Sequence, residues 1–498
     1  MLPDYFQLPK KYEILFLFLS PILLSLFGTV LYNVFFHPLA TVPGPLACKI
    51  SRVWLYLAER GGDGANTLAA LHKRYGPLVR IAPTEVSIKD REAYVTINKQ
   101  GSRFLKDLAF YDAFSSNHGN LFTFSNVDEH SKRKRLMSPS FSRASMEEHD
   151  TIVHATIKPL VEEVVVSVRK GETVALYSVM RRFAIKSIIA FCYGNNLISP
   201  EYIDNTVIPK LFQVLDKSPK DLLVLQHFPI VRRSLRHLAT TFPQLFPEAI
   251  RFLQRVGMEL LDSSRESSDA SQPGLFKRMK ELLKVKEQSL TDGELIAESS
   301  TMFFAGTDTT ATTASVALWY LMHQPDNYAR LQDELKTVMP DVNSRPSLRE
   351  LESLPFLEAC VKESLRLACP IRGRLPRVVP PEGWEVKGVR LPGGTTVSSC
   401  ISYMTYDEDI FSEPMKFRPG RWLQENSKEL DGYLYPFSRG TRSCIGQSLS
   451  LAEQRVAISQ IVRRFSPSKD MQFREIIGKE YVTWVMEDEL PVQLKEAE

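Results

Sequence analysis

The chain has 498 residues, of which 44% are apolar and 24% charged, as in an ordinary globular protein, and its formal net charge is +4 at neutral pH. The length allows about three average domains, and the small net charge gives no reason to expect a nucleic-acid partner. Six cysteines stand without a Cys-x-x-Cys pair, which argues against a disulfide framework or a zinc site and fits a reducing compartment: Cys48, Cys192, Cys360, Cys369, Cys400 and Cys444.

The N-terminal region predicts a membrane anchor. Residues 14–36 form a nearly uninterrupted apolar run, which is long enough to span a bilayer core of ~30 Å. A cleaved secretory signal is the alternative, but its apolar core would be shorter, at ~7–15 residues, and no small-residue cleavage site follows. We therefore expect a transmembrane anchor at residues 14–36, preceded by a short flank at residues 1–13.

A proline-rich segment separates this run from the rest of the chain. His-Pro at residues 37–38 and Val-Pro-Gly-Pro at residues 42–45 exclude a regular helix there. We interpret residues 37–48 as a stiff hinge, with an ordinary loop as the alternative. Residues 49–498 then form one large body.

Hydrophobic periodicity predicts that this body is mainly helical. Residues 146–336 show the period of long amphipathic helices. Residues 78–88 and 377–402 instead show short runs broken by proline and glycine, as in small β-sheets. The polar stretch at residues 263–273 predicts a solvated loop.

The most informative stretch lies near the C-terminus, where a cysteine stands in a loop between two glycines. Phe437, Gly440, Arg442, Cys444 and Gly446 follow the pattern F-x-x-G-x-R-x-C-x-G, and a helix is predicted directly after them. Unpaired N–H groups at a helix N-terminus and a nearby arginine favour an ionised thiol. A buried structural cysteine is the alternative, but five fixed positions at roughly 5% per residue type make a chance match rare.

This pattern resembles the haem-binding loop of the cytochrome P-450 family, the haem-thiolate monooxygenases. The resemblance implies the fold of that family, mainly α with small β-sheets, here preceded by one N-terminal transmembrane helix. It also implies haem b as the cofactor and Cys444 as the axial ligand of the haem iron. Phe437 and Gly446 are then expected next to the macrocycle.

A second motif lies in an apolar helical run at residues 299–322. The sequence AGTDTT at residues 305–310 resembles the family's acid–threonine motif, which implies that Asp308 and Thr309 deliver protons to bound dioxygen. From the residues alone an alternative is equally open. Threonine hydroxyls in a helix can donate to the carbonyl four residues earlier and only bend the helix.

A third motif concerns structure. Glu363 and Arg366 lie three residues apart on one predicted helix, which is a weak signal by itself. The sequence FRPGRW at residues 417–422 resembles the family's F-x-P-x-R-W, although Gly420 stands where an acidic residue is usual. The resemblance implies that Glu363, Arg366 and Arg421 form a buried charged triad that supports the cysteine loop.

Haem propionates need cationic partners, and the resemblance implies Arg442 and Arg377 for this role. A third group is expected from a helix beginning near residue 128, where the family commonly has W-x-x-x-R. This chain has His130 in place of the tryptophan and Lys134 in place of the arginine. Because lysine lacks the bidentate fork of arginine, another basic residue of the 132–135 run remains a candidate, with a solvated basic surface as the alternative.

The substrate-binding residues are the least specific prediction. Aromatic residues are enriched before that helix, at Phe104, Phe110, Tyr111, Phe114, Phe122 and Phe124. Their position is similar to a substrate-lining loop of the family, although aromatic clusters are more often plain core. Residues 211–252 are a candidate lid that touches lipid.

Together the motifs predict a monooxygenase that inserts one oxygen atom from O2 into a small, mostly apolar organic substrate. No G-x-G-x-x-G motif is present, and the resemblance implies electrons from NADPH through a separate NADPH–cytochrome P-450 reductase, with cytochrome b5 as a further candidate donor. It also implies a single-pass anchor in the endoplasmic reticulum and a cytosolic catalytic domain. The hinge and His130 resemble fungal members of the family that act in secondary-metabolite biosynthesis.

Two other functions remain open from the sequence. A haem-thiolate isomerase or dehydratase needs no external electrons, but such enzymes usually lack the acid–threonine pair that this chain keeps. A haem sensor or carrier would not turn over, so NADPH consumption in the presence of a reductase would distinguish it.

Overall fold

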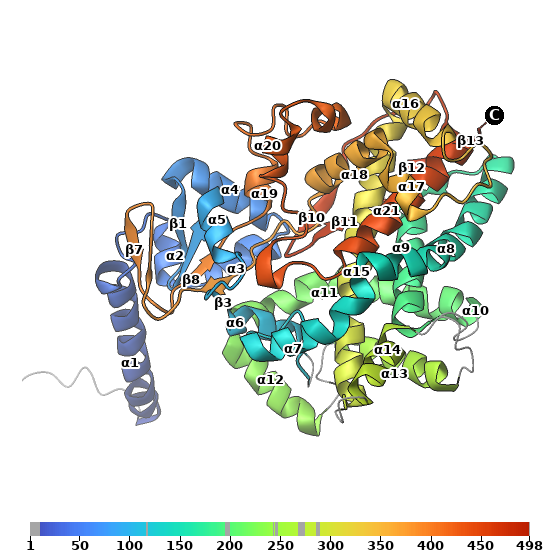
Figure 1. Ribbon diagram of the computed structural model, residues 1–498. Coiled ribbons are helices and arrows are strands. Elements are labelled where there is room, and N and C mark those ends of the chain that lie inside the picture. The colour runs from blue at the N-terminus through green and yellow to red at the C-terminus, as the bar shows by residue number, and fades with distance from the viewer. Residues whose placement is uncertain are drawn as a thin grey trace, which may run out of the picture.

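The computed structural model describes residues 10–115, 118–194, 200–242, 244, 248–266, 274–284 and 289–497. Figure 1 shows a part rich in strands, built mainly from the first hundred residues, beside a larger helical part that contains most of the remaining chain. This arrangement confirms the expected mainly α body with small sheets.

The N-terminal apolar run is helical. Helix α1 spans Lys10–Leu31 and continues into a π-helical turn, η1, at Tyr32–Phe36. The segment Leu19–Phe36 has a mean hydropathy of 1.7 and none of it is buried against the protein. In Figure 1, α1 projects away from the helical part of the molecule. By length and composition, this helix can cross a membrane.

The proline-rich segment packs against the body. Helix α2, Leu46–Ile50, begins within it, and Leu39 and Val42 are buried among the apolar residues of the sheet. The buried side chain of Arg80 donates from Nη1 to the carbonyl oxygens of Asn33, at 2.8 Å, and Leu39, at 3.2 Å. These contacts hold the end of the anchor helix against the sheet.

The main sheet has five strands in the order β1-β2-β8-β5-β3. Strands β1, Leu78–Ala82, and β2, Glu85–Ile88, pair antiparallel and confirm the strands predicted there. Strand β8, Thr396–Ser398, runs parallel to β2, whereas β5, Arg377–Val378, is antiparallel to both β8 and β3, Leu105–Lys106. The sheet thus brings Lys106 and Arg377 opposite each other in register.

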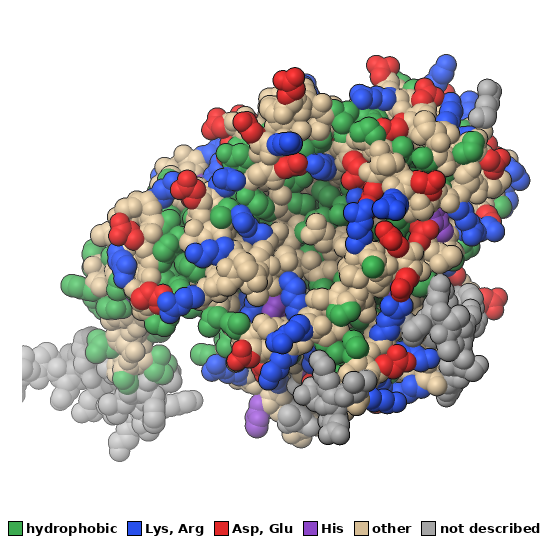
Figure 2. Space-filling view, in the orientation of Figure 1, with side chains coloured by type: hydrophobic (Ala, Val, Ile, Leu, Met, Phe, Trp, Pro, Cys, Tyr) green, Lys and Arg blue, Asp and Glu red, His purple; other side chains and the backbone are tan. Residues whose placement is uncertain are grey.

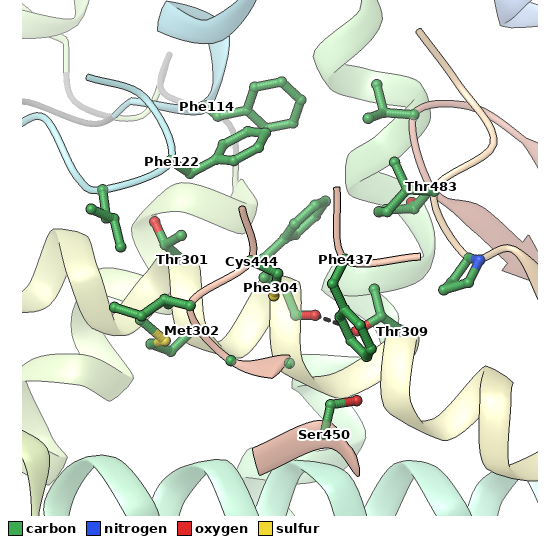
Figure 3. A pocket seen from close by; sticks show the side chains of 18 of the residues that line it. Phe114, Phe122, Thr301, Met302, Phe304, Thr309, Phe437, Cys444, Ser450 and Thr483 are labelled. Carbon is green, nitrogen blue, oxygen red and sulfur yellow. Dashed lines mark hydrogen bonds between the residues drawn. The ribbon is translucent and has the colours of Figure 1, made fainter. Parts of the chain in front are cut away.

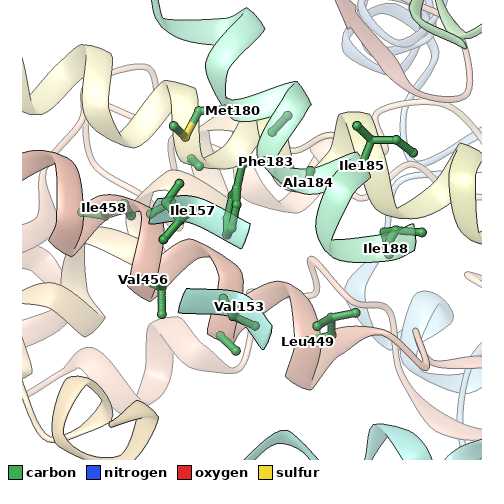
Figure 4. Packing of buried hydrophobic residues seen from close by; sticks show 14 of the residues in the cluster. Val153, Ile157, Met180, Phe183, Ala184, Ile185, Ile188, Leu449, Val456 and Ile458 are labelled. Carbon is green, nitrogen blue, oxygen red and sulfur yellow. The ribbon is translucent and has the colours of Figure 1, made fainter. Parts of the chain in front are cut away.

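The apolar core lies among five helices: α8 Arg143–Arg169, α9 Leu176–Tyr193, α15 Asp292–Met322, α18 Pro355–Ala368 and α21 Gln447–Arg464. Figure 4 shows side chains of α8, α9 and α21 meeting in this core, among them Ile157, Phe183 and Val456. Helix α15 begins with a capping box, in which Thr291 and Glu294 satisfy each other's backbone N–H groups.

Further elements complete the described chain. The helices are α3 Val53–Arg60, α4 Gly64–Tyr75, α5 Arg91–Ile97, α6 Leu108–Tyr111, η2 Asp112–Phe114, α7 Val127–Met137, η3 Ser138–Phe141, α10 Pro200–Tyr202, η4 Ile203–Val207, α11 Ile208–His227, α12 Pro229–Thr241, α13 Glu248–Glu266, α14 Leu275–Lys284, α16 Pro325–Lys336, α17 Leu348–Glu352, α19 Ser402–Thr405, η6 Pro419–Leu423, α20 Ser427–Asp431 and η7 Gly440–Arg442. Two-stranded sheets pair β4 Val174–Ala175 with β12 Pro491–Val492, β6 Trp384–Val386 with β7 Val389–Leu391, β9 Phe465–Pro467 with β13 Leu494–Glu496, and β10 Gly478–Glu480 with β11 Trp484–Met486.

The polar stretch expected to be a loop at residues 263–273 is partly helical. Helix α13 continues to Glu266, because residues 263–266 still have helix-compatible side chains and no proline interrupts them. Residues 267–273 lie outside the described part of the chain. Figure 2 shows acidic and basic side chains interspersed over the visible face, as expected from a net charge near zero.

A fully buried carboxylate, Glu363 on α18, ties this helix to the segment after α19. Arg366 donates to it twice, from Nη2 at 2.8 Å and Nε at 2.9 Å. Arg421 donates from Nε at 3.2 Å, and the indole N–H of Trp422 donates at 2.9 Å. The three charged residues predicted as a triad are therefore in contact, and Trp422 is a partner that the motif did not reveal.

We expect Glu363→Ala to destabilise the protein by ~3–5 kcal/mol, because Arg366 would remain buried without its counter-charge. Lys362→Ala is the matched control on the same helix, since Lys362 forms an exposed ion pair with Asp431 of α20 and its loss should cost at most ~1 kcal/mol. Thermal unfolding and the yield of folded protein measure the difference. Equal stabilities of the two variants would contradict a structural role for the buried cluster.

Candidate active site

A cavity of about 350 Å³ lies between α15, the cysteine loop and the segment before α7. Cys444, Phe437 and Gly446 line it from the cysteine loop, and Thr309 lines it from α15. In Figure 3, Phe114 and Phe122 lie above Cys444, Phe304 and Phe437. The cavity thus brings together residues that lie more than three hundred positions apart.

The cysteine loop is held by its neighbours and not only by its own turn. Gly440 has a φ of +67°, and a Cβ atom there would collide with the backbone of Asn98 and Lys99. The Cys444 N–H donates to the Phe437 carbonyl at 2.9 Å. Glycine at 440 is therefore required both by the turn and by the close approach of the residues after α5.

The Cys444 side chain is enclosed by protein but has open surface toward the cavity. Burial raises the pKa of its thiol above the ordinary value, while the Gly446 N–H and the Lys134 ammonium oppose this shift. A thiolate at Cys444 stays a prediction, and a coordinating metal ion would produce it, because such an ion deprotonates a thiol outright.

Cations gather at one end of the cavity. Arg442 donates to the carbonyls of Phe124, at 2.7 Å, and Ser125, at 2.9 Å. The Lys106 ammonium donates to the Phe122 carbonyl and lies 4.7 Å from the centre of the Tyr111 ring.

Arg377, on β5, does not itself line the cavity but approaches these cations through Tyr111. Its guanidinium donates to the Tyr111 hydroxyl and lies 5.4 Å from the centre of the Tyr111 ring. Within the described residues, no carboxylate forms an ion pair with Lys106, Arg377 or Arg442. Burial and the mutual repulsion of these cations lower the pKa of Arg442 to about 10 and lower that of Lys106 well below its usual range.

These residues fit haem. Two propionates would supply the missing negative charge beside Lys106, Arg377 and Arg442. The buried His130 Nδ1 faces the same region without a hydrogen-bond partner. A Cβ atom added to Gly446 would meet only the Cys444 sulfur, at 3.9 Å, so the loop leaves room for a flat group against its backbone.

Two basic residues of α7 do not face this cluster. Lys134 donates to the Thr441 carbonyl at 2.8 Å and thus braces the cysteine loop from outside the cavity. Arg133 is buried and pairs with Glu298 and with Glu294 of α15. The acidic partner of Arg133 is therefore inside the protein, and neither residue places its charged group among the cavity-lining cations.

Asp308 points away from the cavity and toward α9. Its Oδ1 accepts from Arg181 Nε at 2.8 Å, and Arg181 Nη2 donates to Asp216 at 2.8 Å. The Asp216 side chain is half exposed. Burial raises the pKa of Asp308, and Arg181 opposes that shift. The structure thus links Asp308 to the surface through one arginine.

The threonines in and after the α15 motif differ in their hydrogen-bond partners. Thr307, Thr309 and Thr313 donate to the carbonyl four residues earlier, at 2.7, 2.6 and 2.8 Å, as the alternative from the sequence predicted. Figure 3 shows Thr309 beside the cavity with this hydrogen bond. Thr310 instead shares a hydrogen bond of 3.0 Å with Ser450 of α21.

Of the six aromatic residues considered for substrate contact, Phe114 and Phe122 line the cavity. Their ring centres are 5.3 Å apart, and the Phe114 ring lies 6.3 Å from that of Phe304 on α15. The other four do not line it. Phe104 packs on Trp384, and Phe110 is core, so the plain-core alternative holds for most of this set.

Sequence reasoning missed Lys106, Arg181 and Glu298. Lys106 is a lone cation in an aromatic stretch. This pattern could have indicated its role, because an unpaired buried cation needs an anionic partner. Arg181 and Glu298 gave no such signal, since each takes its role from a partner more than one hundred residues away.

Comparison with known proteins agrees with this geometry. The family described as Cytochrome P450 matches residues 43–492. The cytochrome P450 monooxygenase hkm5 of Aspergillus hancockii is 30% identical over 93% of this chain and 92% of its own length. The cytochrome P450 monooxygenase aflU of Aspergillus parasiticus is 31% identical over 89% of this chain and 90% of its own.

A relative named for a reaction is similar over the same span. The fusicoccadiene C-8 hydroxylase of Alternaria brassicicola is 28% identical over 92% of this chain and 90% of its own length. The family match covers the cysteine loop, the α15 motif and the buried triad together. The chain therefore belongs to the cytochrome P450 family and is a monooxygenase of the type found in fungi.

Proposed function

We propose that this monooxygenase holds haem b through the Cys444 thiolate and oxidises a small, mostly apolar substrate in the cavity above that residue. The observation that carries the proposal is a single cavity lined by Cys444, by Thr309 and by cations without acidic partners. Haem iron with a thiolate ligand supplies the activation of dioxygen and the insertion of one oxygen atom into a C–H or C=C bond.

The residues around the cavity have separable roles in this proposal. Lys106, Arg377 and Arg442 bind the propionates and lose their mutual repulsion, and His130 donates to the same groups. Phe437 shields the Cys444 sulfur from water, and Gly446 admits the macrocycle. Lys134 orients the loop through the Thr441 carbonyl.

Proton supply runs along α15. The carboxyl of Asp308 takes up a proton from solvent when its side chain leaves Arg181, which connects it to the half-exposed Asp216. Thr309 Oγ1, now donating to the Ala305 carbonyl, turns toward the cavity and positions a proton donor there. General acid–base groups in such a relay must exchange protons near neutral pH, and the raised pKa of Asp308 favours this.

The cavity suits a neutral substrate. Away from the cations it is lined by Phe114, Phe122, Leu222, Met302, Phe304 and Val482. Hydroxylation, epoxidation and successive oxidation of one substrate are all compatible with such a lining. The fungal relatives, one of them a named hydroxylase of fusicoccadiene, support a place in secondary-metabolite biosynthesis.

Electrons come from NADPH through a separate NADPH–cytochrome P-450 reductase, with cytochrome b5 as an additional donor. Exposed basic residues on α7, Lys132 and Arg135, suit an acidic partner near the cysteine loop. Omission of the reductase should abolish turnover, and turnover without it would refute this part of the proposal.

The membrane proposed is that of the endoplasmic reticulum. A single anchor at residues 14–36 would leave the catalytic domain, residues 49–498, in the cytosol, where its reduced cysteines are stable. Full-length protein should remain in a carbonate-washed membrane pellet, and a variant lacking residues 1–36 should leave it, because α1 carries the long apolar surface. Full-length protein that washes off would contradict a spanning helix, and a tagged protein that misses a reticulum marker would contradict the compartment.

For the ligand, we expect the reduced protein under carbon monoxide to show the red-shifted Soret band of a thiolate-bound ferrous haem. Cys444→Ala should remove this band, since the sulfur that lines the cavity would be lost. Cys48→Ala is the control, because Cys48 is buried on α2 outside the cavity. A band that survives in Cys444→Ala would show that another cysteine is the ligand.

For the proton relay, we expect Thr309→Ala to keep the carbon-monoxide spectrum but to form less product for each NADPH consumed and to release hydrogen peroxide. Thr309→Ser, which keeps the hydroxyl, should restore coupling. Asp308→Asn should slow the whole cycle, because it removes the group that takes up protons. The assay uses reductase and a substrate identified by comparing metabolites with and without the gene. Unchanged coupling and rate in all three variants would exclude this helix as the proton route.

A further inference from the structure

A turn at residues 120–123 places Phe122 over the cavity. Asn120 closes this turn on itself, since its Oδ1 accepts from the N–H groups of Phe122 and Thr123, both at 3.0 Å. The N–H of Leu121 is not used within the turn. Because a buried backbone N–H without a partner costs about 1–3 kcal/mol, the turn needs an acceptor from elsewhere.

That acceptor is the carboxylate of Glu298 on α15. It receives the Leu121 N–H at 3.0 Å on Oε1 and 3.2 Å on Oε2. The same carboxylate pairs with Arg133 of α7. One side chain, with no exposed surface, therefore joins the turn, α7 and α15.

The charges around Glu298 compensate its burial only in part. Among the described residues, Arg133 is the one cation paired with it, Glu294 adds negative charge from the same helix, and the Cys192 thiol lies near it on α9. Burial raises the pKa of Glu298 to about 7 in spite of Arg133. An apolar side chain of similar volume would avoid this cost, but it could not hold the Leu121 N–H.

A second contact brings the same segment onto α15. Gly293 lies in the first turn of this helix, and a Cβ atom there would collide with the His118 ring. Residues 118–123 therefore meet α15 at two points, one of them a close approach that only glycine permits.

We infer that Glu298 is a positioning residue that fixes the 120–123 turn, and with it Phe122, above the cavity, and so sets the size of the molecule that binds there. The inference rests on the proposed function for its consequence in specificity. The contact between the Glu298 carboxylate and the Leu121 N–H, here called the clamp, is present in the folded chain itself. Loss of the clamp should widen the cavity at Phe122 and leave the haem ligand untouched.

Two variants of Glu298 separate the effect of its side-chain length from the effect of its charge. Glu298→Asp keeps the charge beside Arg133 but is one methylene too short for Leu121. Glu298→Gln keeps the reach and an acceptor oxygen but loses the charge. Glu294→Gln is the matched control, because Glu294 also contacts Arg133 and does not contact Leu121.

Two readouts are measured on the full-length protein. Amide hydrogen exchange at Leu121 should be about tenfold faster in Glu298→Asp, as for the loss of ~1.4 kcal/mol, and near wild type in Glu298→Gln and Glu294→Gln. The second readout is the ratio of the dissociation constants for 4-phenylimidazole and for a bulky trityl imidazole. Only Glu298→Asp should change it, by about tenfold, such that the bulky ligand binds more tightly relative to the small one than in the wild type. The carbon-monoxide band should be unchanged in all of them.

Equal exchange and equal ligand ratios in Glu298→Asp and wild type would overturn the inference, as would a Glu298→Gln variant that behaves like Glu298→Asp. A wild-type protein without the carbon-monoxide band would instead overturn the proposed function. In that case exchange at Leu121 would still report on the clamp, so the two failures are distinguishable.

Discussion

Positive charge without a counter-charge is the constraint on which the site depends. Lys106, Arg377 and Arg442 converge on one end of the cavity, where backbone carbonyls and the Tyr111 ring are their partners. Dipoles and ring faces compensate a buried cation only in part, because they carry no net charge. A dianionic group in the cavity would therefore stabilise the fold as well as complete the site, and its binding would be coupled to the stability of the strands and loops that present these cations.

The same constraint explains the neighbouring structure. Strand β3 is only two residues long, yet it pairs with β5 and sets Lys106 beside Arg377. The loop from Phe122 to Ser125 turns three carbonyls toward the cations. In a regular helix or strand these carbonyls would accept hydrogen bonds from other backbone N–H groups. In the irregular loop they accept from the cations instead.

The sequence predicted well what depends on local pattern and poorly what depends on distant partners. Strands β1 and β2, the long helices and the cysteine loop follow from periodicity and from glycine at 440, where the backbone conformation admits few other residues. The direction of Asp308 could not be predicted in this way, because Arg181 lies 127 residues away. Lys134 donates to the Thr441 carbonyl, a contact that the sequence did not predict because it depends on tertiary packing, and its role toward a propionate stays a prediction.

In the proposed mechanism, the period of helix α15 would connect substrate fit to proton supply. Eleven residues make about three turns, so Glu298 and Thr309 lie on nearly the same face of the helix, about 16 Å apart along its axis. Met302 and Ala305 line the cavity between them. Asp308, one residue before Thr309, is rotated by about 100° and meets Arg181 of α9 instead. One helix thus contacts the 120–123 turn through Glu298 and carries Thr309 beside the cavity, while its neighbouring face meets Arg181 through Asp308. If both proposals hold, a shift of this helix would change the fit of the substrate and the supply of protons together.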